Sequence, residues 1–344
     1  DAWDALRDAF IGERNYLSLP GAVKDGQCTG SYASVFNPAT CMQFKLSLDS
    51  GGVEDIRMLI GGCSNEAMIA ELKETYLTGN LDADAHFDAL LADREKMMEN
   101  ITISAPEESM NYMLNTWVKH QLQYGAKWVR WGYKGYRDIV QNSQGIVYQD
   151  LDQARESLLK ACHHQYQDGF ALRGWHPTDP MRYADSAQWM IGAFSEYAKE
   201  SGDIDIFDVE VPYFDEGSDT VYDHLMKAMV RLREDRGAHG LNLIFFGDWN
   251  DSLTGVGREG KGESVWLSMA FARGALLMAE LAEELGKAED VALMKKWHAE
   301  MSAAINKHCW DGEWYICALD DDGAPIGSKE NEEGRIFLNT QSWA

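Results

Sequence analysis

The stretch GESVWLSMAFARGALLMAELAEELG, residues 262–286, decides the fold class, because its apolar residues recur at every third or fourth position. That spacing places one continuous apolar stripe along an α-helix. The stripe consists of Trp266, Leu267, Ala270, Phe271, Gly274, Leu277, Met278 and Leu281. A stripe of this kind has to be buried against other helices, so we predict a helical domain around it.

The chain beyond about residue 106 repeats this amphipathic pattern, with loops rich in Gly, Pro and Asp between the segments. We predict helices near 107–126, 150–166, 183–200, 217–235, 262–286 and 289–308, and another that begins near Gln341. Such helices fit an α/α toroid, in which inner and outer helices alternate and the loops at one end form a pocket. A helical bundle or a solenoid would give a similar pattern, so the chemistry of the loops has to decide.

The first part of the chain has a different character. Residues 1–65 are rich in Gly and short apolar runs, and MQFKLSL, residues 42–48, alternates like a half-buried strand. One or two strands form no stable sheet alone, so this segment needs a pairing partner. Residues 66–105 are helical in pattern and highly charged. We therefore expect a β-domain segment over 1–65, a helical linker over 66–105 and a helical domain over 106–344.

Charge and composition exclude several classes of partner. The 344 residues carry 31 basic and 56 acidic side chains, a net charge of −25, which repels nucleic acid and anionic lipid. An acidic, well-solvated surface is the simplest interpretation of that excess. No stretch approaches the roughly 18 consecutive apolar residues of a membrane helix. We expect no nucleic-acid or membrane partner.

The cysteines and the first residues bear on the cellular compartment. Six cysteines are scattered without CxxC spacing, and we predict reduced thiols, most of them in the core. The opening DAWDALRDAF, residues 1–10, has neither the basic nor the apolar region of a secretion signal. We therefore expect a cytoplasmic protein.

The segment LIFFGDWNDSLTGVGREGKGES, residues 243–264, carries the chemistry that we consider decisive. An apolar run that leads into an acidic turn can deliver Asp251 to a partly desolvated pocket, where a carboxyl keeps its proton and serves as a general acid. Trp249 offers a flat apolar face to a sugar ring. The alternative is an Asx-type turn in which Asp248 and Asp251 only cap backbone amides.

The same segment closely resembles the signature of glycoside hydrolase family 94, the inverting phosphorylases of cellobiose, chitobiose and related sugars. The match consists of GDWND, residues 247–251, followed by GREGKGESVW, residues 257–266. Four further stretches resemble the family: GYRD 135–138, GWHP 174–177, YADSAQW 183–189 and NEEGRIFLNTQSW 331–343. Residues 16–48 resemble the end of its N-terminal β-sandwich. The resemblance implies a mainly α protein, an (α/α)6 toroid that is incomplete in this chain, preceded by that sandwich end and a helical linker.

The resemblance also implies roles for particular residues. Asp251 would be the general acid, and substrate-binding residues would be Trp249, Arg137, Asp138, Arg182, Asp185, Glu263 and Gln341. Two departures affect the sugar site: Ser186 replaces a second acid after Asp185, and Arg182 lies closer to Asp185 than the family pattern has it. The family's phosphate ligands are expected beyond Ala344.

Several of these residues have a plain structural interpretation. Arg137 and Asp138 could form a buried ion pair, and Glu263 could be an acid that opens a helix, where the helix dipole favours it. The His163–His164 pair points only weakly to a metal, because adjacent helical side chains diverge by about 100° and cannot easily share one ion. We expect neither a metal nor a cofactor.

The expected reaction is inverting phosphorolysis of a β-linked glucoside. Asp251 donates a proton to the leaving oxygen, inorganic phosphate is the co-substrate and nucleophile, and an α-sugar 1-phosphate is released. A β-linked gluco-oligosaccharide and phosphate are the expected partners, and the resemblance implies a homodimer.

Two rival functions stay open. An inverting hydrolase would need a second carboxylate, Glu263 or Asp185, roughly 6.5–9.5 Å from the acid to activate water. A non-catalytic carbohydrate-binding domain of a larger glucan-processing protein would bind sugar without turnover, and Ser186 is in its favour.

Overall fold

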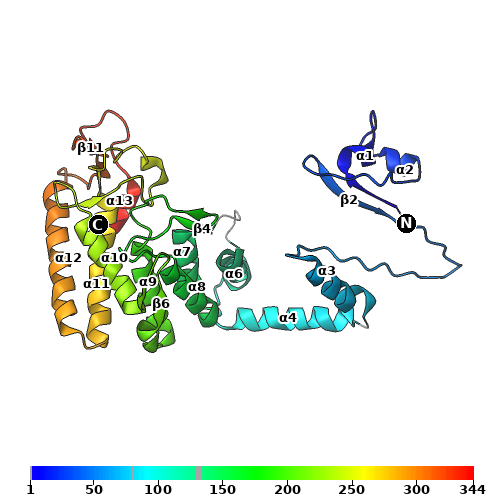
Figure 1. Ribbon diagram of the computed structural model, residues 1–344, viewed down its shortest axis with the longest axis horizontal. Helices are drawn as coiled ribbons and strands as arrows, with labels where there is room; N and C mark the ends of the chain where they lie inside the picture. The colour runs from blue at the N-terminus through cyan, green and yellow to red at the C-terminus, as the bar shows by residue number, and fades with distance from the viewer. Residues whose placement is uncertain (1, 80, 129–133) are drawn as a thin grey trace. The chain divides into compact units, whose positions relative to one another are not determined.

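The computed structural model describes residues 2–79, 81–128 and 134–344, and the chain separates into two compact units, 1–88 and 89–344 (Figure 1). Each unit is described by itself. All six cysteines are free thiols, and four are buried: Cys28, Cys162, Cys309 and Cys317.

The first unit is built on one antiparallel strand pair. Strand β1 (Ala2–Leu6) pairs with β2 (Pro38–Gln43). The buried carboxylate of Asp4 accepts hydrogen bonds from the backbone amides and hydroxyls of Thr29 and Ser31, which fixes that turn against β1. The helices of this unit are α1 (Arg7–Ile11), α2 (Gly21–Lys24), α3 (Glu66–Lys73) with the π-helical turn η1 (Glu74–Thr78), and the start of α4 (Ala83–Glu99).

The strand predicted over residues 42–48 is only partly correct. Strand β2 ends at Gln43, and Phe44, Leu46 and Leu48 lie outside any strand with exposed side chains. Alternation by itself does not hold a strand in water, because its backbone groups need a neighbouring strand and its apolar face needs a cover. Within the described part of this unit, β1 is the partner of β2, and it spans only residues 2–6.

The second unit is mainly helical. Its helices are the end of α4, α5 (Glu108–Tyr112), the π-helical turn η2 (Met113–Val118), α6 (Lys119–Trp128), α7 (Tyr136–Ile146), α8 (Leu151–His163), α9 (Gln188–Ser201), α10 (Val221–Glu234), α11 (Val265–Glu284), α12 (Ala288–His308) and α13 (Leu338–Trp343), with short 3₁₀ turns η3 (Asp205–Asp208) and η4 (Asp251–Leu253).

Successive helices alternate between two layers. The first layer consists of α7, α9, α11 and α13, which contact one another in that order. The second layer consists of α8, α10 and α12, which pack against the first, and α8 also contacts α10. Figure 1 shows α7 to α12 side by side, coloured green through orange. The core lies between the layers, and its largest fully buried side chains include Trp266, Tyr136 and Phe194. The predicted apolar stripe of residues 262–286 is therefore buried, as expected.

Helix α11 also has the length and mean hydropathy of a membrane-spanning segment, but 78% of that stretch is buried inside the protein. A core helix meets the same two criteria, so length and composition are weak evidence for a membrane span.

Three helix predictions need correction, and one helix was missed. Helix α7 was not predicted, although Tyr136, Ile139 and Val140 supply a buried stripe at helical spacing. The helix predicted over 107–126 is interrupted by the π-helical turn η2, α9 begins at Gln188 rather than 183, and α13 begins at Leu338. The late start of α9 has a physical cause: Tyr183 and Ala184 pair with another loop instead of extending the helix.

Short antiparallel strands precede several helices of the first layer. One sheet has the order β3 (Lys134–Gly135), β4 (Gly174–His176), β5 (Thr178–Asp179). A second has the order β11 (Pro325–Ile326), β10 (Ala318–Leu319), β9 (Glu263–Ser264), β8 (Asn242–Leu243), and β6 (Glu210–Pro212) pairs with β7 (Ser218–Thr220). Because β3 leads directly into α7 and β9 into α11, the strands fix where these helices begin. The candidate site lies at those N-terminal ends.

Candidate active site

The GDWND loop, residues 247–251, is held by a loop that precedes α9. Tyr183 forms β-bridges with Phe245 and Gly247, and the Ala184 amide donates a hydrogen bond to the Gly247 carbonyl over 3.0 Å. A Cβ on Gly247 would lie 3.3 Å from the Tyr183 ring, so the close approach of the two segments favours glycine there. This contact brings Asp185, just before α9, next to the GDWND loop.

Asp248 is the buried anchor of that loop. Its Oδ1 accepts hydrogen bonds from the backbone amide and the side-chain amide of Asn250, at 2.8 and 3.1 Å, and its Oδ2 accepts one from the Ser264 hydroxyl. Desolvation raises the pKa of Asp248, and these hydrogen bonds oppose that rise. The Asx-type turn considered from the sequence therefore describes Asp248 correctly.

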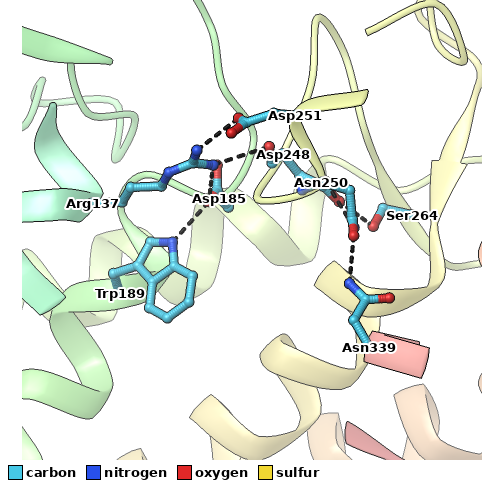
Figure 2. A network of polar contacts seen from close by, with 8 residues as sticks. All are labelled: Arg137, Asp185, Trp189, Asp248, Asn250, Asp251, Ser264 and Asn339. Carbon is cyan, nitrogen blue, oxygen red and sulfur yellow. Dashed lines mark hydrogen bonds and ion pairs between the residues drawn. The ribbon is translucent and has the colours of Figure 1, made fainter. Parts of the chain in front are cut away.

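Two helices of the first layer are connected to this anchor. Ser264 is the N-cap of α11. Its hydroxyl oxygen accepts a hydrogen bond from the Leu267 amide at 3.0 Å, and the same hydroxyl donates a hydrogen bond to Asp248. Asn339, in the first turn of α13, donates a hydrogen bond to the side-chain oxygen of Asn250. Figure 2 shows these contacts as one continuous network. The loop geometry is thus set by the helix that follows it, α11, and by α13, which is distant in sequence.

Arg137, in the first turn of α7, lies between three acidic residues (Figure 2). Its Nη2 lies 2.6 Å from Oδ1 of Asp251, and its Nη1 lies 3.2 Å from the Asp248 carbonyl and 3.8 Å from Oδ2 of Asp185. Partial burial lowers the pKa of Arg137, but Asp185 and Asp251 more than offset this and raise it. The Arg137–Asp138 ion pair considered from the sequence is not the one that forms.

Asp185 is withdrawn from water, with 1% of its side chain exposed. Its Oδ2 accepts a hydrogen bond from the Trp189 indole at 2.8 Å. Desolvation and the neighbouring Asp248 carboxyl raise the pKa of Asp185 to about 7, against the opposing effects of Trp189 and Arg137. This carboxyl therefore changes its charge near neutral pH.

Asp251 does not lie in the desolvated pocket that we expected. Its side chain is 71% exposed, and it begins the 3₁₀ turn η4. The buried carboxyls of the cluster are Asp185 and Asp248. The correction has a simple cause: the apolar run before the loop buries Asp248, and the turn that follows carries Asp251 outward to Arg137.

Trp249 has the flat, partly open face that a sugar platform requires. It is 37% exposed, and its other face stacks on Trp266 with ring centroids 5.6 Å apart and an angle of 30°. Trp266 in turn contacts Trp189 and Trp343, so four indoles form one cluster behind the loop. An indole face of this kind, next to the exposed carboxyl of Asp251, can pack against the apolar face of a carbohydrate ring.

Three predicted substrate-binding residues lie outside this cluster. Arg182 extends over the Phe170 ring, 4.9 Å from its centroid. Glu263 is buried in β9, before the helix rather than in it, and accepts hydrogen bonds from His239 and from the Leu241 amide. The side-chain amide of Gln341 is bonded to the backbone of Tyr315, at 3.1 and 2.7 Å. The latter two side chains stabilise loops in this structure.

Asp138 follows Arg137 in the first turn of α7 and is exposed. Its carboxylate lies against the helix start, where a Cβ on Gly135 would come within 2.1 Å of Oδ2. It also contributes to the raised pKa of Arg137. Asp138 therefore borders the cluster without bonding to it.

The sequence interpretation missed four contributors: Trp189, Asn250, Ser264 and Asn339. Ser264 had a recognisable signal, since a serine directly before an apolar helical stripe is a typical N-cap. Asn339 lies in the NEEGRIFLNTQSW stretch, but Gln341 was chosen from it instead. Within the described ranges, no group of three or more His, Cys, Asp or Glu side chains is arranged to hold a metal ion.

Comparison with known families finds two matches that cover most of the chain. The model of the Glycosyl hydrolase 94 superfamily, catalytic domain, matches residues 94–344, and that of the Glycosyl hydrolase 94 supersandwich domain matches residues 1–78. The resemblance stated from the sequence motifs is confirmed.

Relatives of known activity match over nearly the full chain. The solabiose phosphorylase of Paenibacillus borealis is 36% identical over 99% of this chain and 44% of its own length, and the 3-O-beta-D-glucopyranosyl-beta-D-glucuronide phosphorylase of that species is 31% identical over 100% and 46%. The cyclic beta-(1,2)-glucan synthase of Rhizobium meliloti is 27% identical over 99% of this chain and 13% of its own length. The chain thus spans less than half the length of these relatives.

Proposed function

Because the chain belongs to the Glycosyl hydrolase 94 superfamily, we propose that it catalyses inverting phosphorolysis of a β-linked glucoside, with Asp251 as the general acid. The solabiose and glucuronide phosphorylases described above are the relatives that support this reaction type. The proposal also includes inorganic phosphate as the nucleophile, an (α/α)6 arrangement of the helical layers and a homodimer.

One observation carries the assignment of Asp251. Of the three aspartates around Arg137, Asp185 and Asp248 have buried side chains, whereas the side chain of Asp251 is 71% exposed. A general acid has to reach the glycosidic oxygen of a bound sugar, so accessibility favours Asp251. The neighbouring Trp249 face gives that sugar a place to lie.

In the proposed reaction, the carboxyl proton of Asp251 passes to the glycosidic oxygen as the bond from this oxygen to the anomeric carbon breaks. A phosphate oxygen forms the new bond to that carbon from the opposite face, which inverts the β-linkage into an α-sugar 1-phosphate. Phosphate is already anionic near neutral pH and needs no base to activate it. One essential carboxyl is therefore sufficient.

The contacts of the other acids favour phosphorolysis over hydrolysis. An inverting hydrolase needs a second carboxylate that activates water. The candidates were Glu263 and Asp185, but Glu263 is occupied by His239 and two backbone amides, and Asp185 is buried against Trp189 and Arg137. Neither carboxylate is exposed to solvent, where it could take a proton from an attacking water.

The proposal is tested by incubating the protein with a panel of β-linked disaccharides, with and without inorganic phosphate, and following the sugars by proton NMR. We expect consumption of one disaccharide only when phosphate is present, with an α-anomeric sugar 1-phosphate as the first product. Equal release of free sugar in both conditions would identify a hydrolase, and sugar binding without turnover would identify a binding domain.

A further inference from the structure

A second cavity lies beside the GDWND loop and outside the cluster around Arg137. Its volume is about 300 Å³, and loops from three places in the chain enclose it. Its charged and aromatic lining residues are Tyr166, Asp168 and Phe170 between α8 and β4, Arg182 between β5 and α9, and Asp215 between β6 and β7. We call it the Tyr166 cavity. Its size is that of a small-molecule site.

The Tyr166 cavity adjoins the segment that leads into the GDWND loop. The ring of Phe170, in the cavity wall, lies 5.9 Å from the ring of Phe245, two residues before that loop. On the same side, Arg182 directly precedes Tyr183, which is bridged to Gly247 of the loop. A single oligosaccharide can therefore reach both the GDWND loop and the cavity.

The charges of the lining favour a neutral ligand with many hydroxyl groups. The carboxylates of Asp168 and Asp215 repel an anion, and the guanidinium of Arg182 repels a cation. Among the described residues, Arg182 has no carboxylate at ion-pair distance and contacts only the Phe170 ring. One oxygen of Asp215 accepts the Gln167 amide at 2.9 Å, and its other oxygen stays available. Unused donors and acceptors thus face one cavity.

Tyr166 adds a hydroxyl and an aromatic face to this lining. Its side chain is partly buried, and its ring packs edge-on against Phe214 with the centroids 5.5 Å apart. Burial and the carboxylates of Asp215 and Asp168 raise the pKa of the Tyr166 hydroxyl, which therefore keeps its proton at neutral pH and can donate a hydrogen bond. An aromatic ring among polar groups suits a sugar, which has apolar faces and hydroxyl edges.

We propose that the Tyr166 cavity is a further carbohydrate subsite, which binds a sugar unit beyond the two that flank the cleaved bond. Arg182, Tyr166 and Asp215 are the substrate-binding residues of this subsite. A β-linked gluco-oligosaccharide of three or more units then binds better than a disaccharide. The place of the subsite in turnover rests on the proposed function, whereas the binding itself is measured without any reaction.

Isothermal titration calorimetry without phosphate tests the binding directly. The probes are glucose disaccharides and trisaccharides with β-1,2, β-1,3 and β-1,4 linkages. For one linkage, the trisaccharide should bind about tenfold more tightly than the disaccharide, because its third unit gains a ring contact and hydrogen bonds. Equal affinities of the two lengths in all three linkages, or no binding of either length, would overturn the proposal.

Two variants place the third sugar unit. Tyr166→Ala should reduce the advantage of the trisaccharide over the disaccharide to about twofold or less. Asp215→Asn keeps an oxygen for the Gln167 amide, so the loop stays in place, and it should weaken trisaccharide binding by about fivefold. Tyr148→Ala is the matched control, because Tyr148 is a partly exposed tyrosine beyond the C-terminal end of α7, whereas the site lies at the N-terminal end.

The outcomes separate this subsite from the proposed function. A preference for the trisaccharide that survives both Tyr166→Ala and Asp215→Asn places its third unit elsewhere and overturns the proposal. Turnover of the disaccharide panel with phosphate decides the reaction independently. If no disaccharide is consumed but the two variants abolish a measured trisaccharide preference, the proposed reaction fails and the subsite stands.

Discussion

The two ends of the DWND segment differ sharply, although Asp248 and Asp251 are only three residues apart. Asp248 is buried and accepts hydrogen bonds from Asn250 and Ser264, whereas Asp251 is exposed and contacts a single arginine. The buried end is fixed by α11 and α13, and the exposed end by α7. The difference teaches that one short motif can hold a buried acid that anchors the loop and an acid that stays open to solvent.

The largest contrast should appear in stability. Replacing Asp248 by Ala leaves the Ser264 hydroxyl and both Asn250 donors without an acceptor, so we expect the free energy of unfolding to fall by about 2–3 kcal/mol. Asp251→Ala removes one exposed ion pair and should cost about 0.5 kcal/mol or less. Urea denaturation of the two variants measures both values. Equal losses of unfolding free energy in the two variants would contradict the view that Asp248 stabilises the loop and Asp251 does not.

The helical pattern was the most predictable part of the fold. A long apolar stripe such as that of α11 has to be buried whatever surrounds it, so its position follows from spacing alone. The strand predicted over residues 42–48 was only partly correct, because pairing depends on a partner that local sequence does not specify. Helix α7 was missed, although Tyr136, Ile139 and Val140 supply a buried stripe at helical spacing.

The site was predictable only as far as its motif. Trp249, Asp251, Arg137 and Asp185 lie together as their shared resemblance to one family suggested, but burial did not follow from sequence. The burial of Asp248 depends on contacts of its loop with Ser264, at the start of the next long helix, and with Asn339, which lies far along the chain. Glu263 and Gln341 are polar residues of the same motifs, yet both bind neighbouring loops.

A smaller effect, on substrate binding, is expected at Trp249 in the indole cluster. Trp249→Ala removes a partly exposed face that rests on Trp266, so we expect KM for the disaccharide to rise by about tenfold, the equivalent of roughly 1.4 kcal/mol. The fold should be retained because Trp266 stays buried. Steady-state kinetics measure this effect. The control is Trp310→Ala, because Trp310 is an exposed indole that packs edge-on against Tyr315. An unchanged KM for Trp249→Ala would remove Trp249 from the sugar site.

The smallest effect should come from the link to α13. Asn339→Ala removes one hydrogen bond to Asn250 and should lower kcat/KM by roughly fivefold, as the loss of about 1 kcal/mol implies. Asn306→Ala is a suitable control, because Asn306 bonds to Tyr315 and Ser302 on α12. If both variants lose the same activity, the contact between α13 and the loop has no special role.

The proposed transfer of a proton from exposed Asp251 to the leaving group is tested most directly by comparing two substrates in Asp251→Asn. The leaving group of a 2,4-dinitrophenyl β-glycoside departs without being protonated, whereas the leaving sugar of a disaccharide needs a proton. With phosphate present, we predict a loss on the order of 10²–10⁴-fold for the disaccharide and only a few-fold loss for the aryl glycoside. An equal loss for both substrates would contradict the account.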